Sequence, residues 1–176
     1  TLPTAHTCLT HLLDATLLTA HTCLTHLLDA TLALAQMVAF ADVRFCTEDT
    51  VFQAPEVDIG LAADIGGNQM LPKILGNDSF LREIQLSGRK VTAKEAFALG
   101  LVSRVLPTYT ELMAHATELA ETIASKSPLA VLGVKTMLNY TRDHTVEDSL
   151  RFGLTWNAAM LQTKDVQIAG AAFVTK

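Results

Sequence analysis

Apolar and polar positions alternate over short stretches in the middle of the chain, whereas apolar residues in the last third recur at three- and four-residue intervals. Alternation and β-branched residues predict short strands at 39–45 and 51–53, joined by the polar turn Thr47–Thr50. A further strand is predicted at 101–106, after the helix-ending Gly100. The pattern is therefore α/β at first and helical from about residue 108 onward.

Capping residues set the expected helix boundaries. Gly66-Gly67 precedes a helix expected to run to Leu75, where Gly76-Asn77-Asp78 ends it. Thr92-x-x-Glu95 is a capping-box sequence, in which each side chain bonds the other residue's backbone N–H. The later helices are expected to begin at Thr108, at Ser127-Pro128, at Thr145 and near Thr163.

The beginning of the chain contains an identical repeat, in which Thr4–Leu17 recurs as Thr19–Leu32. The leucines of each copy have helical spacing, so a leucine-faced helix is one interpretation. Each copy also contains His-x-Cys-x-x-His, a possible site for a soft metal, but one cysteine and one aspartate per copy supply few ligands. We predict no metal site there, and a recent duplication or a misread gene segment explains identical copies equally well.

Composition excludes several classes of protein. The 176 residues suffice for one domain with a real core. A formal net charge of −5, with no basic stripe, argues against a nucleic-acid surface. Three cysteines do not form a disulfide framework. Asp14 and Asp29 interrupt the leucine-rich start, so no membrane span is expected, and no targeting signal is seen.

Two carboxylates, Glu56 and Asp64, lie in an otherwise apolar stretch that contains no basic residue between Pro55 and Lys73. Burying a carboxylate without a cation nearby costs about several kcal/mol, so such groups need an explanation. A pair of them is suited to moving a proton from one carbon to another. The structural alternative makes Glu56 a turn residue and Asp64 a helix N-cap.

Several longer motifs surround these acids. They are Ala41–Cys46, Val51–Gly60, Leu86–Arg89, Ala93–Val105 and the helix start Ser127-Pro128. With them, the chain from about residue 37 to 176 resembles the crotonase (enoyl-CoA hydratase/isomerase) superfamily. The run Glu-Val-Asp-Ile-Gly-Leu-Ala-Ala-Asp at 56–64 resembles the Δ3,5-Δ2,4-dienoyl-CoA isomerase branch, as do Tyr140–His144, Trp156-Asn157 and Met160–Thr163.

The resemblance implies the C-terminal part of a crotonase-like ββα superhelix, followed by a helical region used for oligomerisation. The expected division is 1–36 as the duplicated segment, 37–107 as partial core and 108–176 as the helical region. It also implies a homotrimer or hexamer, and a mitochondrial or peroxisomal location in a eukaryote.

The activity that the resemblance implies is conversion of 3,5-dienoyl-CoA to 2,4-dienoyl-CoA in fatty-acid β-oxidation, here by a truncated chain. Glu56 and Asp64 are the expected catalytic residues, with Glu56 acting at C2 and Asp64 at C6, or the reverse. Pro55, Gly60 and Leu61 are expected to contact the substrate. The acyl-CoA is the substrate, and neither a cofactor nor a metal is expected.

Two other functions stay open. An enoyl-CoA hydratase shares the fold, but that branch has Gly where Asp64 stands. An inactive remnant is the second, because the family's oxyanion hole needs Gly-rich turns and no glycine precedes Gly60. The family's third acid would fall near Gln36, an amide. Arg44 and Arg89 are candidates for a CoA phosphate, with ion pairing as the alternative.

Overall fold

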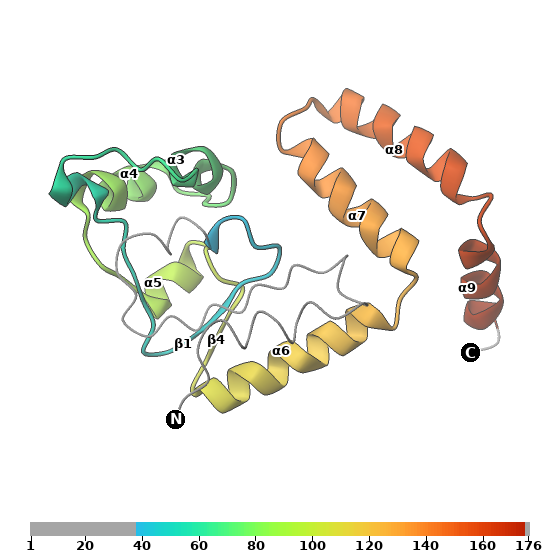
Figure 1. Ribbon diagram of the computed structural model, residues 1–176, viewed down its shortest axis with the longest axis horizontal. Helices are drawn as coiled ribbons and strands as arrows, with labels where there is room; N and C mark the ends of the chain where they lie inside the picture. Colours follow the sequence, from blue (N-terminus) through green and yellow to red (C-terminus); the bar gives the residue numbers. More distant parts are fainter. Residues whose placement is uncertain (1–37, 175–176) are drawn as a thin grey trace. The chain divides into compact units, whose positions relative to one another are not determined.

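Short strands in two pairs organise the first part of the chain in the computed structural model, which describes residues 38–174 (Figure 1). Strand β1 (Phe45–Thr47) pairs in parallel with β4 (Arg104–Leu106), with Phe45 opposite Arg104. Strand β2 (Val51–Phe52) pairs antiparallel with β3 (Val91–Thr92). The duplicated segment and Gln36 lie outside the described residues.

The predicted strand at 39–45 is wrong over most of its length. Val38, Ala39 and Ala41 are at most 4% exposed, but they lie in a turn in which the Ala41 N–H donates to the Val38 carbonyl (3.1 Å). The strand begins only at Phe45, and all three of its residues are buried. Parallel strands are commonly covered on both faces, so alternation does not mark this one.

Helices of the first unit, residues 38–120, differ from expectation in one region. The helix predicted at 67–75 is a short α3 (Gly67–Met70) followed by a 3-10 turn η2 (Leu71–Lys73), where Pro72 supplies no N–H. Sequence reasoning missed α4 (Asp78–Ser87) altogether. Asn77, interpreted as a helix end, is its N-cap and accepts a hydrogen bond from the Phe80 N–H (3.0 Å).

The remaining predictions for this unit agree better with the structure. Helix α5 (Ala93–Ala98) has the predicted capping box, and α6 (Tyr109–Ala124) begins one residue after Thr108. The strand expected at 101–106 is shorter, at 104–106. The main core lies among α4, α5 and the β2–β3 pair, and a smaller core joins β1 to α6. Central members of the two cores are Phe52, Leu81, Val91, Val102, Phe45 and Leu112.

The second unit, residues 121–174, is helical. Helices α7 (Pro128–Thr141) and α8 (Val146–Met160) form a hairpin (Figure 1), followed by α9 (Lys164–Val174). The predicted N-caps Ser127 and Thr145 both accept backbone hydrogen bonds. Among the described residues no helix is both long and apolar enough to cross a bilayer.

Candidate active site

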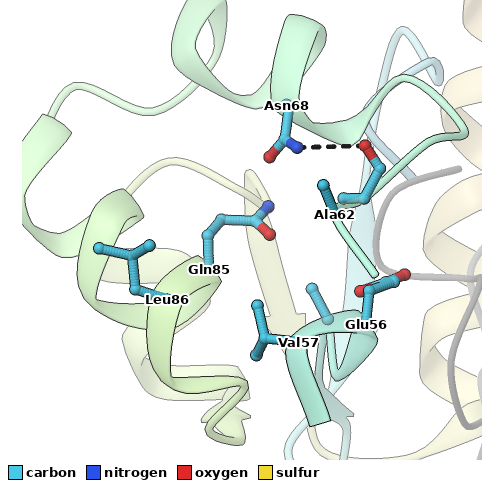
Figure 2. A pocket seen from close by; sticks show the side chains of 8 residues that line it. Glu56, Val57, Ala62, Asn68, Gln85 and Leu86 are labelled. Atoms are coloured by element: carbon cyan, nitrogen blue, oxygen red, sulfur yellow. Dashed lines mark hydrogen bonds between the residues drawn. The ribbon is translucent and has the colours of Figure 1, made fainter. Parts of the chain in front are cut away.

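A pocket of about 130 Å³ lies in the first unit beside Glu56 (Figure 2). Its wall comes from the 3-10 helix η1 (Glu56–Ile59), the loop that follows it, α3 and α4. Most of the lining is apolar, and the polar side chains are a carboxylate and two amides. The lining residues are Ala54, Glu56, Val57, Ala62, Ala63, Asn68, Gln85 and Leu86.

A reversal of the chain after η1 closes the pocket. Gly60 adopts a φ of 76°, a left-handed conformation that glycine reaches without steric cost. The Leu61 N–H then donates to the Glu56 carbonyl (2.9 Å), which turns the loop back over η1. Ala62 and Ala63 consequently face the same space as Glu56. The Gly60 of the sequence motif therefore shapes the pocket without lining it.

Glu56 is the charged residue that the fold buries within residues 38–174, with 9% of its surface exposed. It begins η1, so its position is fixed by the helix and by the turn at Gly60. Its carboxylate lies at the edge of the pocket (Figure 2). A carboxylate held in an apolar pocket is a suitable group for taking up or releasing a proton.

The other predicted site residues lie around the pocket and not on its wall. Asp64 is exposed on the loop before α3, and Leu61 is 55% exposed. Pro55 is half-buried and precedes η1. Asp64 is also not an N-cap, because Gly66 occupies that position of α3. The structure thus brings Glu56 to the pocket and leaves Asp64 at the surface.

Two pocket residues, Asn68 and Gln85, were missed in the sequence. Asn68 donates from Nδ2 to the Ala63 carbonyl (3.1 Å) and so ties α3 to the loop. Gln85 follows the buried Leu81 by four residues on α4, which places it on the inward face of that helix. That spacing was readable in the sequence, but only once a helix over 78–87 had been predicted.

Both arginines considered for a CoA phosphate have partners within the chain. Arg44 donates to the carbonyls of Leu101 (2.5 Å) and Ala41 (2.7 Å). Arg89 pairs with Glu83 (2.7 Å) and Glu95 (3.0 Å), and the Glu83 hydrogen bond is the main cause of its raised pKa. The structure favours the alternative that these arginines hold the fold.

Comparisons with known proteins support the α/β crotonase fold. Residues 33–176 match the family model "Enoyl-CoA hydratase/isomerase". The chain is 49% identical over 130 residues to the mitochondrial Δ(3,5)-Δ(2,4)-dienoyl-CoA isomerase of Rattus norvegicus, covering 74% of this chain and 40% of that protein. It is 41% identical over 140 residues to the peroxisomal isomerase of Arabidopsis thaliana, covering 80% of this chain and 50% of that protein.

Among solved structures, the enoyl-CoA hydratase of Bacillus anthracis superposes with a TM-score of 0.73 at 28% identity, covering 78% of this chain and 52% of that one. The chain therefore spans about half the length, or less, of these relatives. The match nevertheless extends over most of the chain, and it includes η1, its carboxylate and all the later helices. The chain belongs to the enoyl-CoA hydratase/isomerase family, also called the crotonase family.

Proposed function

We propose that this chain carries the proton-transfer part of a dienoyl-CoA isomerase, which converts 3,5-dienoyl-CoA to 2,4-dienoyl-CoA in fatty-acid β-oxidation. The observation that carries the proposal is the buried Glu56 carboxylate at an apolar pocket. Similarity to mitochondrial and peroxisomal proteins of that name supports it, and supports the same two compartments as the location.

The chemistry needs one proton acceptor and one proton donor. A base removes a proton from C2, the double bonds move from C3 and C5 to C2 and C4, and an acid returns a proton to C6. We assign C2 to Glu56 and C6 to Asp64, with the reverse order as the alternative. Hydrogen bonds stabilise the intermediate thioester enolate, so the reaction needs neither a metal nor a redox cofactor.

The size of the pocket suits the reacting part of such a substrate. A cavity of about 150 Å³ holds one benzene ring, so about 130 Å³ accommodates roughly five or six carbon-sized atoms. The dienoyl unit from C1 to C6 has that size. Pro55, Gly60 and Leu61 frame the pocket entrance in this proposal, since they flank the lining residues in the sequence.

Replacing Asp64 by Asn tests the isomerase. Turnover of a 3,5-dienoyl-CoA should fall by about 10²- to 10⁴-fold, the usual contribution of an acid–base group. Asp58→Asn is the matched control, because Asp58 is also exposed, lies six positions earlier and does not line the pocket. Unchanged turnover in Asp64→Asn would show that Asp64 transfers no proton, and the two-carboxylate mechanism would fail.

A hydratase is the second candidate, and one observation favours it. Glu56 is the carboxylate that lines the pocket, whereas Asp64 is outside it. Incubation with a 2-enoyl-CoA separates the two reactions by mass, because hydration adds one water to the product and isomerisation leaves the mass unchanged. If the chain binds no acyl-CoA in a calorimetric titration, the inactive remnant without an oxyanion hole becomes the better account.

A homotrimer or hexamer completes the proposal. The helices of the second unit expose large apolar side chains, which a partner subunit would cover. Examples are Leu138, Leu150, Leu154, Ile168 and Phe173. No nucleic-acid partner is proposed, given the net charge of −5.

A further inference from the structure

The loop between η1 and α3 carries Asp64 past the pocket, and both of its ends are anchored. At the first end the Leu61 N–H donates to the Glu56 carbonyl (2.9 Å). At the other end Gly66 has a φ of 94°, and the Phe40 ring lies so close that a Cβ there would be 2.6 Å from it. Within the described part of the chain no hydrogen bond or ion pair holds the Asp64 carboxylate. Its position therefore depends on the backbone in the middle of the loop.

Asn68 acts on the peptide group that leads into Asp64. Its Nδ2 donates to the Ala63 carbonyl (3.1 Å), the hydrogen bond marked by the dashed line in Figure 2. That carbonyl belongs to the same planar peptide group as the Asp64 nitrogen, so a hydrogen bond to it fixes the plane from which the Asp64 side chain projects. Ala63 lines the pocket and Asp64 does not. A rotation of this peptide group consequently turns the Asp64 side chain toward the pocket or away from it.

The hydrogen bond lies where a substrate would strengthen it. Asn68 is exposed when the pocket is empty, but both Asn68 and Ala63 line that pocket. An acyl chain in the pocket would shield the hydrogen bond from water, and a hydrogen bond is stronger where water is excluded. The tether would then be firmest in the complex with substrate, when the acid has to be in place.

We propose that Asn68 is a positioning residue, which holds the Asp64 carboxylate in the place from which it exchanges a proton with the substrate. Asn68 takes no part in the proton transfer itself, because its side-chain amide only donates and accepts hydrogen bonds. This inference rests on the proposed isomerase function and on the role of Asp64 in it. It adds to the two carboxylates a third residue, supplied by α3.

Proteolysis of the folded chain tests the tether without relying on turnover. Endoproteinase Asp-N cleaves on the N-terminal side of aspartate, so it attacks the Ala63–Asp64 bond itself when the loop opens. Asn68→Leu should speed this cleavage about fivefold, because loss of one hydrogen bond raises the open population by about that factor. Cleavage before Asp58 in η1 is the internal reference and should not change. Gln69→Leu, an exposed position of α3 that does not line the pocket, should leave both rates unchanged.

Turnover of a 3,5-dienoyl-CoA then links the tether to Asp64. Asn68→Leu should lower kcat by about 10- to 100-fold, because misplacing a reacting group by about 1 Å costs up to about 10²-fold. In the Asp64→Asn background the same substitution should leave kcat unchanged, since the group that Asn68 positions is already absent. A merely structural role would lower kcat in both backgrounds alike. Asn68→Ala removes the donor without adding an apolar side chain to the pocket, and it should reproduce both results.

Three results would overturn the proposal. Equally fast cleavage before Asp64 in the unsubstituted chain and in both Asn68 variants shows that Asn68 does not hold the loop, and it leaves the isomerase function intact. An equal loss of kcat with and without Asp64 assigns the effect of Asn68 to the pocket as a whole. A folded, unsubstituted chain that turns over no 3,5-dienoyl-CoA overturns the proposed isomerase and the positioning role with it, even where proteolysis confirms the tether.

Discussion

Burial separates the two carboxylates that the sequence presents as a pair. Glu56 is 9% exposed and lines a pocket, whereas Asp64 is exposed on the following loop. A carboxylate accepts a proton from a substrate carbon more readily where water does not solvate it. The buried Glu56 is therefore better placed for this role than the exposed Asp64.

Replacing Glu56 by Gln should remove the proton acceptor and keep the shape of the side chain. We expect kcat for the dienoyl-CoA reaction to fall by about 10²- to 10⁴-fold, with little change in melting temperature. Glu48→Gln is the control, because Glu48 lies in an exposed turn away from the pocket. A stable Glu56→Gln variant with full activity would contradict the assignment.

Cys46 in β1 should be nearly inert toward alkylation in the folded chain. Burial, assisted by the negative charge of Asp49 and opposed by a hydrogen bond to Thr50, raises the pKa of its thiol from 9.0 to about 11. Only about one thiol in a thousand is then ionised at pH 8, and the thiolate is the reactive form. Peptide mass spectrometry after iodoacetamide treatment measures this, with the urea-unfolded chain as the reactive reference.

The same thiol gives a pH dependence of known sign. Because its folded pKa lies above its unfolded pKa, the contribution to stability is complete below about pH 9 and is lost as the pH rises through about 11. Rapid alkylation of Cys46 in the folded chain at pH 8 would show that β1 is more open than the structure indicates.

Helix α5 depends on its capping box, and the acid in that box makes the helix sensitive to pH. The backbone N–H of Thr92 is the main cause of the lowered pKa of Glu95, followed by the Thr92 hydroxyl and then Arg89. Because the folded pKa of Glu95 is lowered, its carboxylate stabilises the folded chain at pH values above the unfolded pKa of about 4.5. This contribution to stability is lost as the pH falls below that value and through the folded pKa.

Glu95→Gln should therefore weaken the loss of stability between about pH 5 and pH 3, while the glutamine still caps the helix. Urea unfolding at several pH values measures this slope. Glu118→Gln on the exposed face of α6 is the control and should leave the slope unchanged. If both substitutions changed the pH dependence of stability equally, the cause would be the loss of one negative charge and not the capping box of α5.

The α7–α8 hairpin depends on a glycine that admits an indole ring. A Cβ at Gly133 would lie 2.5 Å from Trp156 Nε1, closer than real Cβ contacts. We expect Gly133→Ala to lower stability, because overpacking costs about 1–3 kcal/mol and exceeds the helix-propensity gain of about 1 kcal/mol. Gly170→Ala on α9 has open space around it and should be neutral or stabilising in the same thermal-melt comparison.

Elements with strong end signals could be predicted from the sequence, and those without them could not. Thr92, Ser127 and Thr145 cap helices as expected, because each supplies a local hydrogen bond. Helix α4 was missed because Gly76-Asn77 reads as a stop, although Asn77 begins the next helix. Strand β1 is buried throughout, so it lacked the alternation by which strands are recognised.

The candidate site was only partly predictable for a similar reason. Glu56 was identifiable because an acid without nearby bases is conspicuous in any apolar stretch. Gln85 was not, because its inward position depends on the register of α4, and nothing in its own chemistry marks it. Pocket residues from separate elements converge only through tertiary packing, which local sequence patterns do not encode.

At the scale of the whole molecule, the two units differ in how much they bury. The first unit has two cores of buried side chains. In the second unit no residue of α8 or α9 is buried, although both helices carry leucines, isoleucine or phenylalanine. Apolar area of this extent on exposed helices is typical of an interaction surface, and a second copy of the chain is the partner that the proposed trimer or hexamer would supply.

Leu154→Glu should therefore lower the molar mass of the sedimenting species in analytical ultracentrifugation, from that of an oligomer toward that of a single chain. Leu154 is 73% exposed on α8, and a carboxylate there would have to be desolvated in any subunit contact. Thr155→Glu adds the same charge at the next position, about 100° around the helix, and should leave the mass unchanged. If the unsubstituted chain and both variants sediment as monomers, the apolar face of α8 does not join copies of this chain, and the proposed trimer or hexamer fails with it.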